Sequence, residues 1–192
     1  MRILVIDNGS SYIDELLYLL EDNDLSVTSF SSDIRSAAKD KDVVILSGGH
    51  SFPIEGNESL FKKEMDFVVD PGVPVIGVCF GSELIARAFG AEIESLPRKE
   101  KGMVMIRMSE NNIFPDIEEF PVFENHSFAV KKLPESLIEI ASSSDGVEIF
   151  RHKLLPVWGL QFHPEMNNEK SGGDEFIIRL IDHLVKKENP AS

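Results

Sequence analysis

Three short apolar runs, each followed by a glycine-containing turn, constrain the fold of this chain more than any other feature. The runs cover residues 2–6, 42–46 and 74–78. Nearly continuous runs of valine, isoleucine and leucine are typical of strands that are buried on both faces of a parallel sheet. Segments with the period of an amphipathic helix follow the runs, at residues 11–21, 57–69 and 82–89. This repetition predicts an α/β domain with a mostly parallel central sheet flanked by helices.

The second half of the chain has a different pattern. Short strands alternate there with proline, asparagine and serine turns, which predicts a smaller antiparallel or mixed β region. The expected strands cover residues 103–108, 120–123, 137–141, 146–150 and 157–162. A broad apolar stripe over residues 174–187 predicts a closing helix. Because no repeat or linker interrupts the chain, we expect residues 1–192 to form one domain.

Charge and cysteine content exclude several classes of partner. The chain has 33 acidic against 19 basic side chains, a formal net charge of −14, which repels nucleic-acid phosphates and anionic membranes. The single cysteine, Cys79, excludes an intramolecular disulfide and paired zinc-binding cysteines. No group of histidines, cysteines and carboxylates has ligand spacing, so we expect neither metal nor cofactor. The short apolar run at the start is no signal peptide, and we expect a cytoplasmic protein that begins at residue 1.

The turns after the first strands indicate where chemistry takes place. Ligands of open α/β sheets bind at the carboxyl ends of the strands, so we expect Gly9, Gly49 and Cys79 at one edge. Cys79 stands on a strand-to-helix turn within the sequence GVCFG at residues 77–81. A following helix presents its positive end to the thiol, which predicts a lowered thiol pKa and a reactive thiolate. The alternative is a small buried apolar side chain.

A reactive thiol needs a base, and His163 is the histidine best placed to provide it. His163 follows the expected strand 157–162, which would bring it to the same edge of the sheet. Glu165 could hold its imidazole in the tautomer that accepts a proton from sulfur. The alternative is a simple turn that ends the strand.

Three segments together resemble the class I glutamine amidotransferases, also called triad glutaminases. They are SGG at 47–49, GVCFG at 77–81 and QFHPE at 161–165, and the resemblance covers essentially the whole chain. It implies that Cys79 is the nucleophile, His163 the general base and acid, and Glu165 the orienting residue. It also implies that the backbone N–H groups of Gly49 and Phe80 bind the oxyanion. By resemblance, glutamine is hydrolysed through a cysteine thioester, and ammonia passes to a synthetase subunit or domain on a separate chain.

The chain departs from the family pattern at two positions. Glu83 replaces the usual glutamine four residues after the nucleophile, where it helps to bind substrate, and its carboxylate would raise the thiol pKa. The alternative role of Glu83 is to complement the helix dipole. His50 replaces a frequent proline and would alter the oxyanion loop. Residues 123–130 resemble the glutamine-contacting loop, which implies that Ser127 and Phe128 line the pocket. Their alternative is an edge strand with a buried histidine.

Within the family, the length, the opening Asp7–Ser10 and residues 152–165 resemble the separate glutaminase subunit of GMP synthases. Residues 125–130 are instead similar to the small subunit of carbamoyl-phosphate synthase, and anthranilate synthase component II has a similar length. Two further interpretations remain open. One is a γ-glutamyl hydrolase or amidase that acts alone, in which Glu83 selects an amine-bearing substrate. The other is a weakly active regulatory subunit.

Overall fold

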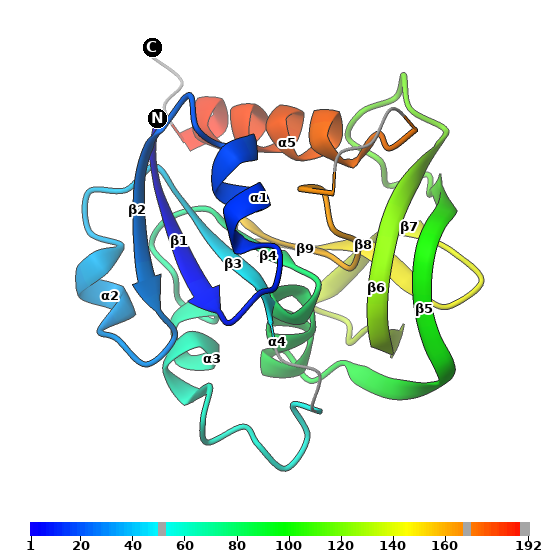
Figure 1. The fold of residues 1–192 in the computed structure, drawn as a ribbon, viewed down its shortest axis with the longest axis horizontal. Helices are drawn as coiled ribbons and strands as arrows, with labels where there is room; N and C mark the ends of the chain where they lie inside the picture. Colours follow the sequence, from blue (N-terminus) through cyan, green and yellow to red (C-terminus); the bar gives the residue numbers. More distant parts are fainter. Residues whose placement is uncertain (50–52, 167–169, 189–192) are drawn as a thin grey trace.

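A computed structural model, shown in Figure 1, describes residues 1–49, 53–166 and 170–188. Within these ranges nine strands form a single sheet in the order β2-β1-β3-β4-β9-β8-β6-β5-β7. The strands are β1 (Arg2–Asn8), β2 (Asp24–Ser29), β3 (Val43–Gly49), β4 (Val75–Val78), β5 (Glu92–Met108), β6 (Glu119–Lys132), β7 (Leu137–Ser142), β8 (Val147–His152) and β9 (Val157–Leu160). The helices are α1 (Ile13–Leu19), α2 (Ile34–Ala37), α3 (Lys62–Val68), α4 (Phe80–Ala88) and α5 (Gly173–Glu188).

The α/β class is confirmed, but the prediction of a mostly parallel sheet is wrong in detail. The strands from β2 to β9 in the sheet order pair in parallel, whereas all pairings among β5, β6, β7, β8 and β9 are antiparallel. The reason lies in β9, which pairs in parallel with β4 on one side and antiparallel with β8 on the other. The expected second β region therefore extends the first sheet instead of forming a separate one.

Alternating side chains of the parallel strands build two hydrophobic layers. Ile3 and Val5 pack with apolar residues of α1 and α5 on one face of the sheet. Leu4 and Ile6 face the other way, toward α2, α3 and α4. Figure 1 shows the same division, with α1 and α5 above the sheet and the other helices below it. Because both faces are covered, these strands are apolar along their whole length, which made them readable from sequence.

Two elements were not predicted because their sequences lack a strong pattern. β2 is an edge strand with only half-buried side chains, so it has no continuous apolar run. The first part of β5, from residue 92 to 101, is polar and contains Pro97. Its pairing with β6 is irregular between Ser95 and Glu100, as expected where a proline removes a ladder donor.

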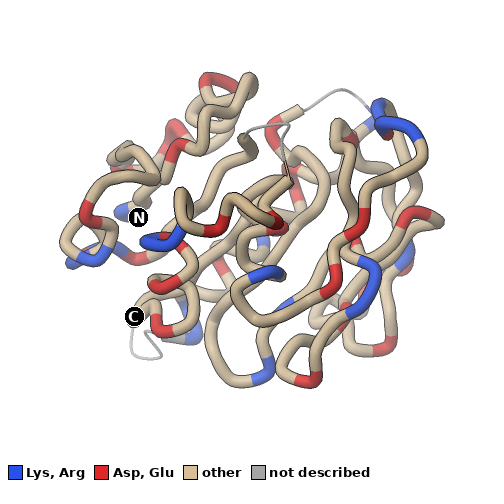
Figure 2. Tube along the Cα trace, turned by 90° about the horizontal axis from the view of Figure 1, so that it is seen from below, with Lys and Arg blue, Asp and Glu red and all other residues tan. Residues whose placement is uncertain are grey.

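Acidic and basic residues are interspersed over both halves of the molecule, as Figure 2 shows. No helix among the described residues is both long and apolar enough to span a bilayer.

Candidate active site

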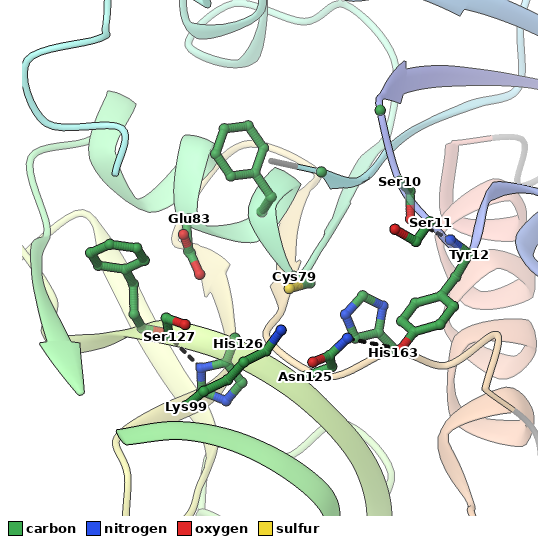
Figure 3. Close-up of a pocket in the computed structure, with 14 residues that line it drawn as sticks. Ser10, Ser11, Tyr12, Cys79, Glu83, Lys99, Asn125, His126, Ser127 and His163 are labelled. Carbon is green, nitrogen blue, oxygen red and sulfur yellow. Dashed lines mark hydrogen bonds between the residues drawn. The ribbon is translucent and has the colours of Figure 1, made fainter. Parts of the chain in front are cut away.

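A cavity of about 320 Å³ opens at the carboxyl ends of β1, β3 and β4. Its lining includes Gly9, Gly49 and Cys79, which confirms that the three turns meet at one edge of the sheet. The cavity also brings together all the other predicted site residues except Glu165, which lies behind the imidazole of His163: they are Phe80, Glu83, Ser127, Phe128 and His163. Figure 3 shows how the labelled side chains surround the Cys79 thiol.

Cys79 occupies a strained turn between β4 and α4. Its φ of 47° and ψ of −106° lie in a region that residues with a side chain rarely adopt. Two glycines allow the tight passage: a Cβ on Gly77 would lie 2.5 Å from the backbone of Gly81, and one on Gly81 would lie 2.5 Å from the Leu46 carbonyl oxygen. The turn is held by the Cys79 N–H, which donates to the Leu160 carbonyl at 2.8 Å. This geometry is that of a nucleophile elbow.

The predicted low pKa of the Cys79 thiol is wrong. Burial raises the pKa of the thiol well above its ordinary value, and the nearby carboxyl groups of Glu83, Glu124 and Glu165 raise it further. The backbone N–H of Phe80 acts in the opposite direction, as expected at the beginning of a helix, but it does not outweigh burial. The sulfur therefore rests as a thiol and needs a base before it can react.

His163 reaches the cavity because β9 lies beside β4 in the sheet. Val78 and Leu160 are paired in the parallel register, one residue before Cys79 and three before His163. The Nδ1 atom of His163 lies 2.8 Å from Oε1 of Glu165, and both side chains are buried. A proton on Nδ1 is thereby held by the carboxylate, which leaves Nε2 free to accept another. Both Cys79 and His163 line the cavity, and Figure 3 shows the imidazole on the side of the thiol.

Glu83 stands in the first turn of α4 with its carboxyl group buried. Burial raises its pKa to about 7, while a hydrogen bond from Gln161 and the proximity of His126 act to lower it. Oε1 of Glu83 accepts that hydrogen bond from Nε2 of Gln161 at 3.1 Å. The expected influence of Glu83 on the thiol is present, since it raises the Cys79 pKa.

Gly49 lies against both Asn8 and Phe80. A Cβ at this position would be 2.7 Å from the Asn8 carbonyl oxygen and 3.0 Å from Cδ1 of Phe80, so only glycine fits. Asn8 is the register partner of Gly49, and its N–H donates to Oγ of Ser47 at 3.0 Å. The prediction that His50 alters this loop falls outside the described residues.

Several side chains that line the cavity were not predicted from the sequence. Tyr12 was assigned to a helix, but it precedes α1, and its ring meets the His163 ring edge-on with centroids 4.9 Å apart. Asn125 donates to the Tyr12 hydroxyl at 2.8 Å. The turn after β1 was a usable signal for Tyr12, because the neighbouring Gly9 was placed at the cavity. No signal in the sequence pointed to Lys99, which also lines it.

Within the described ranges, no cluster of three or more histidine, cysteine or acidic residues has the arrangement of a metal site.

Comparison with known proteins gives consistent matches along the chain. A family model described as glutamine amidotransferase class-I matches residues 4–182. One relative, from the glutamine-hydrolyzing GMP synthase of Pyrococcus furiosus, is a single subunit of that enzyme. It is 34% identical over 179 residues, which cover 90% of this chain and 93% of the relative. The GMP synthase of Thermosipho africanus is 30% identical over 151 residues, which cover 76% of this chain but only 28% of that relative.

A solved structure with the same fold comes from Thermoplasma acidophilum. It is a crystal structure of a candidate subunit of GMP synthase, with a TM-score of 0.86 and 28% sequence identity. The match covers 99% of this chain and 96% of that one. The nine-stranded sheet and its elbow therefore have a counterpart in an experimental structure.

Proposed function

The chain belongs to the class-I glutamine amidotransferase family, and on this basis we propose that it hydrolyses glutamine for GMP synthesis and passes the ammonia to a synthetase on a separate chain. The observation that carries the proposal is the meeting of the Cys79 elbow and the His163–Glu165 pair at one cavity. The similarity to the Pyrococcus GMP synthase subunit, which extends over most of both chains, supports the acceptor. The Thermosipho relative, of which this chain matches only a part, supports a synthetase partner.

In the first half of the reaction, His163 removes the thiol proton as sulfur attacks the side-chain carbonyl carbon of glutamine. A base is required because burial keeps the pKa of the thiol high. The oxyanion that forms accepts hydrogen bonds from the N–H groups of Gly49 and Phe80, and losing one such donor costs about 3 kcal/mol in the barrier. His163 then returns the proton to the amide nitrogen, the carbon–nitrogen bond breaks, and ammonia leaves.

In the second half, water hydrolyses the γ-glutamyl thioester. His163 takes a proton from water as the hydroxide adds to the thioester carbonyl, and the carbon–sulfur bond breaks to release glutamate and the free thiol. Glu165 keeps Nδ1 protonated throughout, so that Nε2 alone exchanges protons. Ser127, Phe128 and Glu83 form the remaining walls that hold the glutamine.

The test is to measure glutamate release from glutamine, alone and with the synthetase component of a GMP synthase, whose product is assayed as GMP. We expect hydrolysis that increases with the partner, together with GMP formation driven by glutamine. Cys79→Ala should abolish hydrolysis while the thermal unfolding curve shows an intact fold. Activity that persists in this variant would remove Cys79 from its assigned role.

A second candidate is an amidase that acts without a partner on a γ-glutamyl compound bearing an amine. The buried carboxyl group of Glu83 at the cavity favours it, because an ammonium group would supply the missing counter-charge. Turnover of such an amine in preference to glutamine, with no response to a synthetase, would select this function.

A further inference from the structure

A cluster of buried titratable side chains lies beside the cavity and has no part in the chemistry described above. Glu124 and His126 come from β6 and Glu148 from β8, and their exposed fractions are 1%, 4% and 2%. Burying three such groups is costly unless they neutralise one another through hydrogen bonds. Their contacts show how this is done.

The protons of the cluster can be assigned atom by atom. Nδ1 of His126 lies 2.6 Å from the carbonyl oxygen of Phe128, and a carbonyl only accepts, so Nδ1 carries a proton. Nε2 lies 3.1 Å from Oε2 of Glu124, so a second proton lies between these two atoms. The carboxyl groups of Glu124 and Glu148 are within hydrogen-bonding reach of each other, which requires a third. Ser143 donates to Oε1 of Glu148 at 2.6 Å.

This assignment leaves the cluster with no net charge. If the second proton resides on Nε2, His126 is a cation and Glu124 an anion, and if it resides on Glu124 both are neutral. Glu148 keeps its proton in either case. Burial raises the pKa of Glu124 to about 8 and that of Glu148 well above its ordinary value, which agrees with protons being retained there.

The cluster lies where β6 has no backbone pairing on the side that faces β8. Among the described residues, β6 and β8 share one register pair, Val130 with Val147, and the two strands diverge beyond it. Glu124 and Glu148 bridge the separated part, and His126 ends the chain of contacts at the Phe128 carbonyl. Ser127 and Phe128 line the cavity directly beyond this contact. Figure 3 shows His126 beneath this wall, on the cavity side of β6.

We propose that Ser143, Glu148, Glu124 and His126 form a proton-sharing relay that fixes the β6 wall of the cavity and so sets the affinity for the amide substrate. Glu124 and Glu148 are positioning residues, because they act through His126 and the Phe128 carbonyl. The proposal rests on the proposed function only for its substrate. Its mechanical part concerns the order of β6 and can be measured without turnover.

The test compares Glu148→Leu with Glu148→Gln. Leucine has a similar size but leaves Glu124 and Ser143 without their partner. Glutamine can still donate to Glu124 and accept from Ser143. We expect Glu148→Leu to raise KM for glutamine about tenfold, with kcat changed less than about threefold. Glu148→Gln should restore KM to within about twofold. Glu119→Leu, at an exposed position on β6, is the control and should change neither constant.

Hydrogen–deuterium exchange of residues 124–130 gives a readout that does not depend on catalysis. We expect faster exchange in Glu148→Leu and unchanged exchange in Glu148→Gln. The relay is refuted if Glu148→Leu leaves both exchange and KM unchanged, if Glu148→Gln is as impaired as Glu148→Leu, or if kcat falls while KM stays constant. Absence of glutaminase activity in the unaltered protein would refute the proposed function, and the exchange comparison would still decide the relay.

Discussion

At the scale of single residues, Glu83 is where this chain departs most informatively from its family. Its carboxyl group is buried, shares a hydrogen bond with Gln161 and raises the pKa of the Cys79 thiol. With a pKa raised to about 7, it is partly protonated near neutrality. The mismatch noted from sequence is therefore softened by the environment, because a protonated Glu83 resembles the glutamine that it replaces.

The variant Glu83→Gln measures the effect of that carboxylate. We expect glutamine hydrolysis to remain unchanged or to increase a few-fold, and alkylation of Cys79 by iodoacetamide to begin at lower pH. Both follow from removing a negative charge beside the thiol. The pH profile of alkylation is the measurement, and Glu94→Gln on exposed β5 is the control. A large loss of activity would mean that the carboxylate itself serves the reaction.

At the scale of secondary-structure elements, the elbow depends on how closely α4 approaches the sheet. Gly77 in β4 touches the backbone of Gly81 and Ser82, so a side chain there cannot be accommodated by rotating a neighbour. The position of the thiol relative to Gly49 and His163 is fixed by this contact. Displacement by about 1 Å is enough to lower a catalytic rate roughly a hundredfold.

Gly77→Ala should therefore lower kcat about a hundredfold, with the protein destabilised by about 1–3 kcal/mol through overpacking. Glutaminase kinetics and urea denaturation are the measurements. Gly72→Ala is the matched control: its φ of 69° makes alanine costly there too, but no atom lies within 4 Å of the added Cβ. It should lose stability without losing kcat. Equal kinetics in the two variants would show that the elbow tolerates a shift of α4.

The elements differ in how far their sequence revealed them. β1, β3 and β4 were predictable because burial on both faces leaves an apolar run, and their turns led to Gly9, Gly49 and Cys79. His163 could be found because its strand is equally apolar. The continuity of the sheet was not predictable, since it depends on which neighbours β9 pairs with. Nor was the relay, because its carboxyl groups on β6 and β8 are far apart in sequence and alternate with apolar residues as surface positions do.

At the scale of the whole molecule, buried carboxyl groups give an acidic protein an unusual response to pH. Glu64 on α3 has an exposed fraction of 0%, and burial raises its pKa from 4.5 to about 8, although Asn8 acts to lower it. Folding therefore retains a proton that the unfolded chain loses above pH 4.5. The contribution of Glu64 is fully present below that pH and is lost as pH rises toward 8. The loss is about 1.4 kcal/mol for each pH unit in that window.

We expect the free energy of unfolding to decrease between about pH 5 and pH 8, with Glu83 and Glu124 adding to the effect of Glu64. Glu64→Gln should flatten this dependence and be more stable than the unaltered protein at about pH 8. Urea denaturation at several pH values measures it, with the exposed Glu110→Gln as control. A pH slope that Glu64→Gln leaves unchanged would show that Glu64 ionises without penalty in the folded protein.

The adjacency of β4 and β9 has a consequence for how the protein is made. The ribosome releases the thiol-bearing turn first, and about eighty further residues are synthesised before the strand that carries the imidazole can insert next to it. A nascent or truncated polypeptide thus contains the sulfur without its base. Ammonia production is in this way reserved for molecules whose translation is nearly finished.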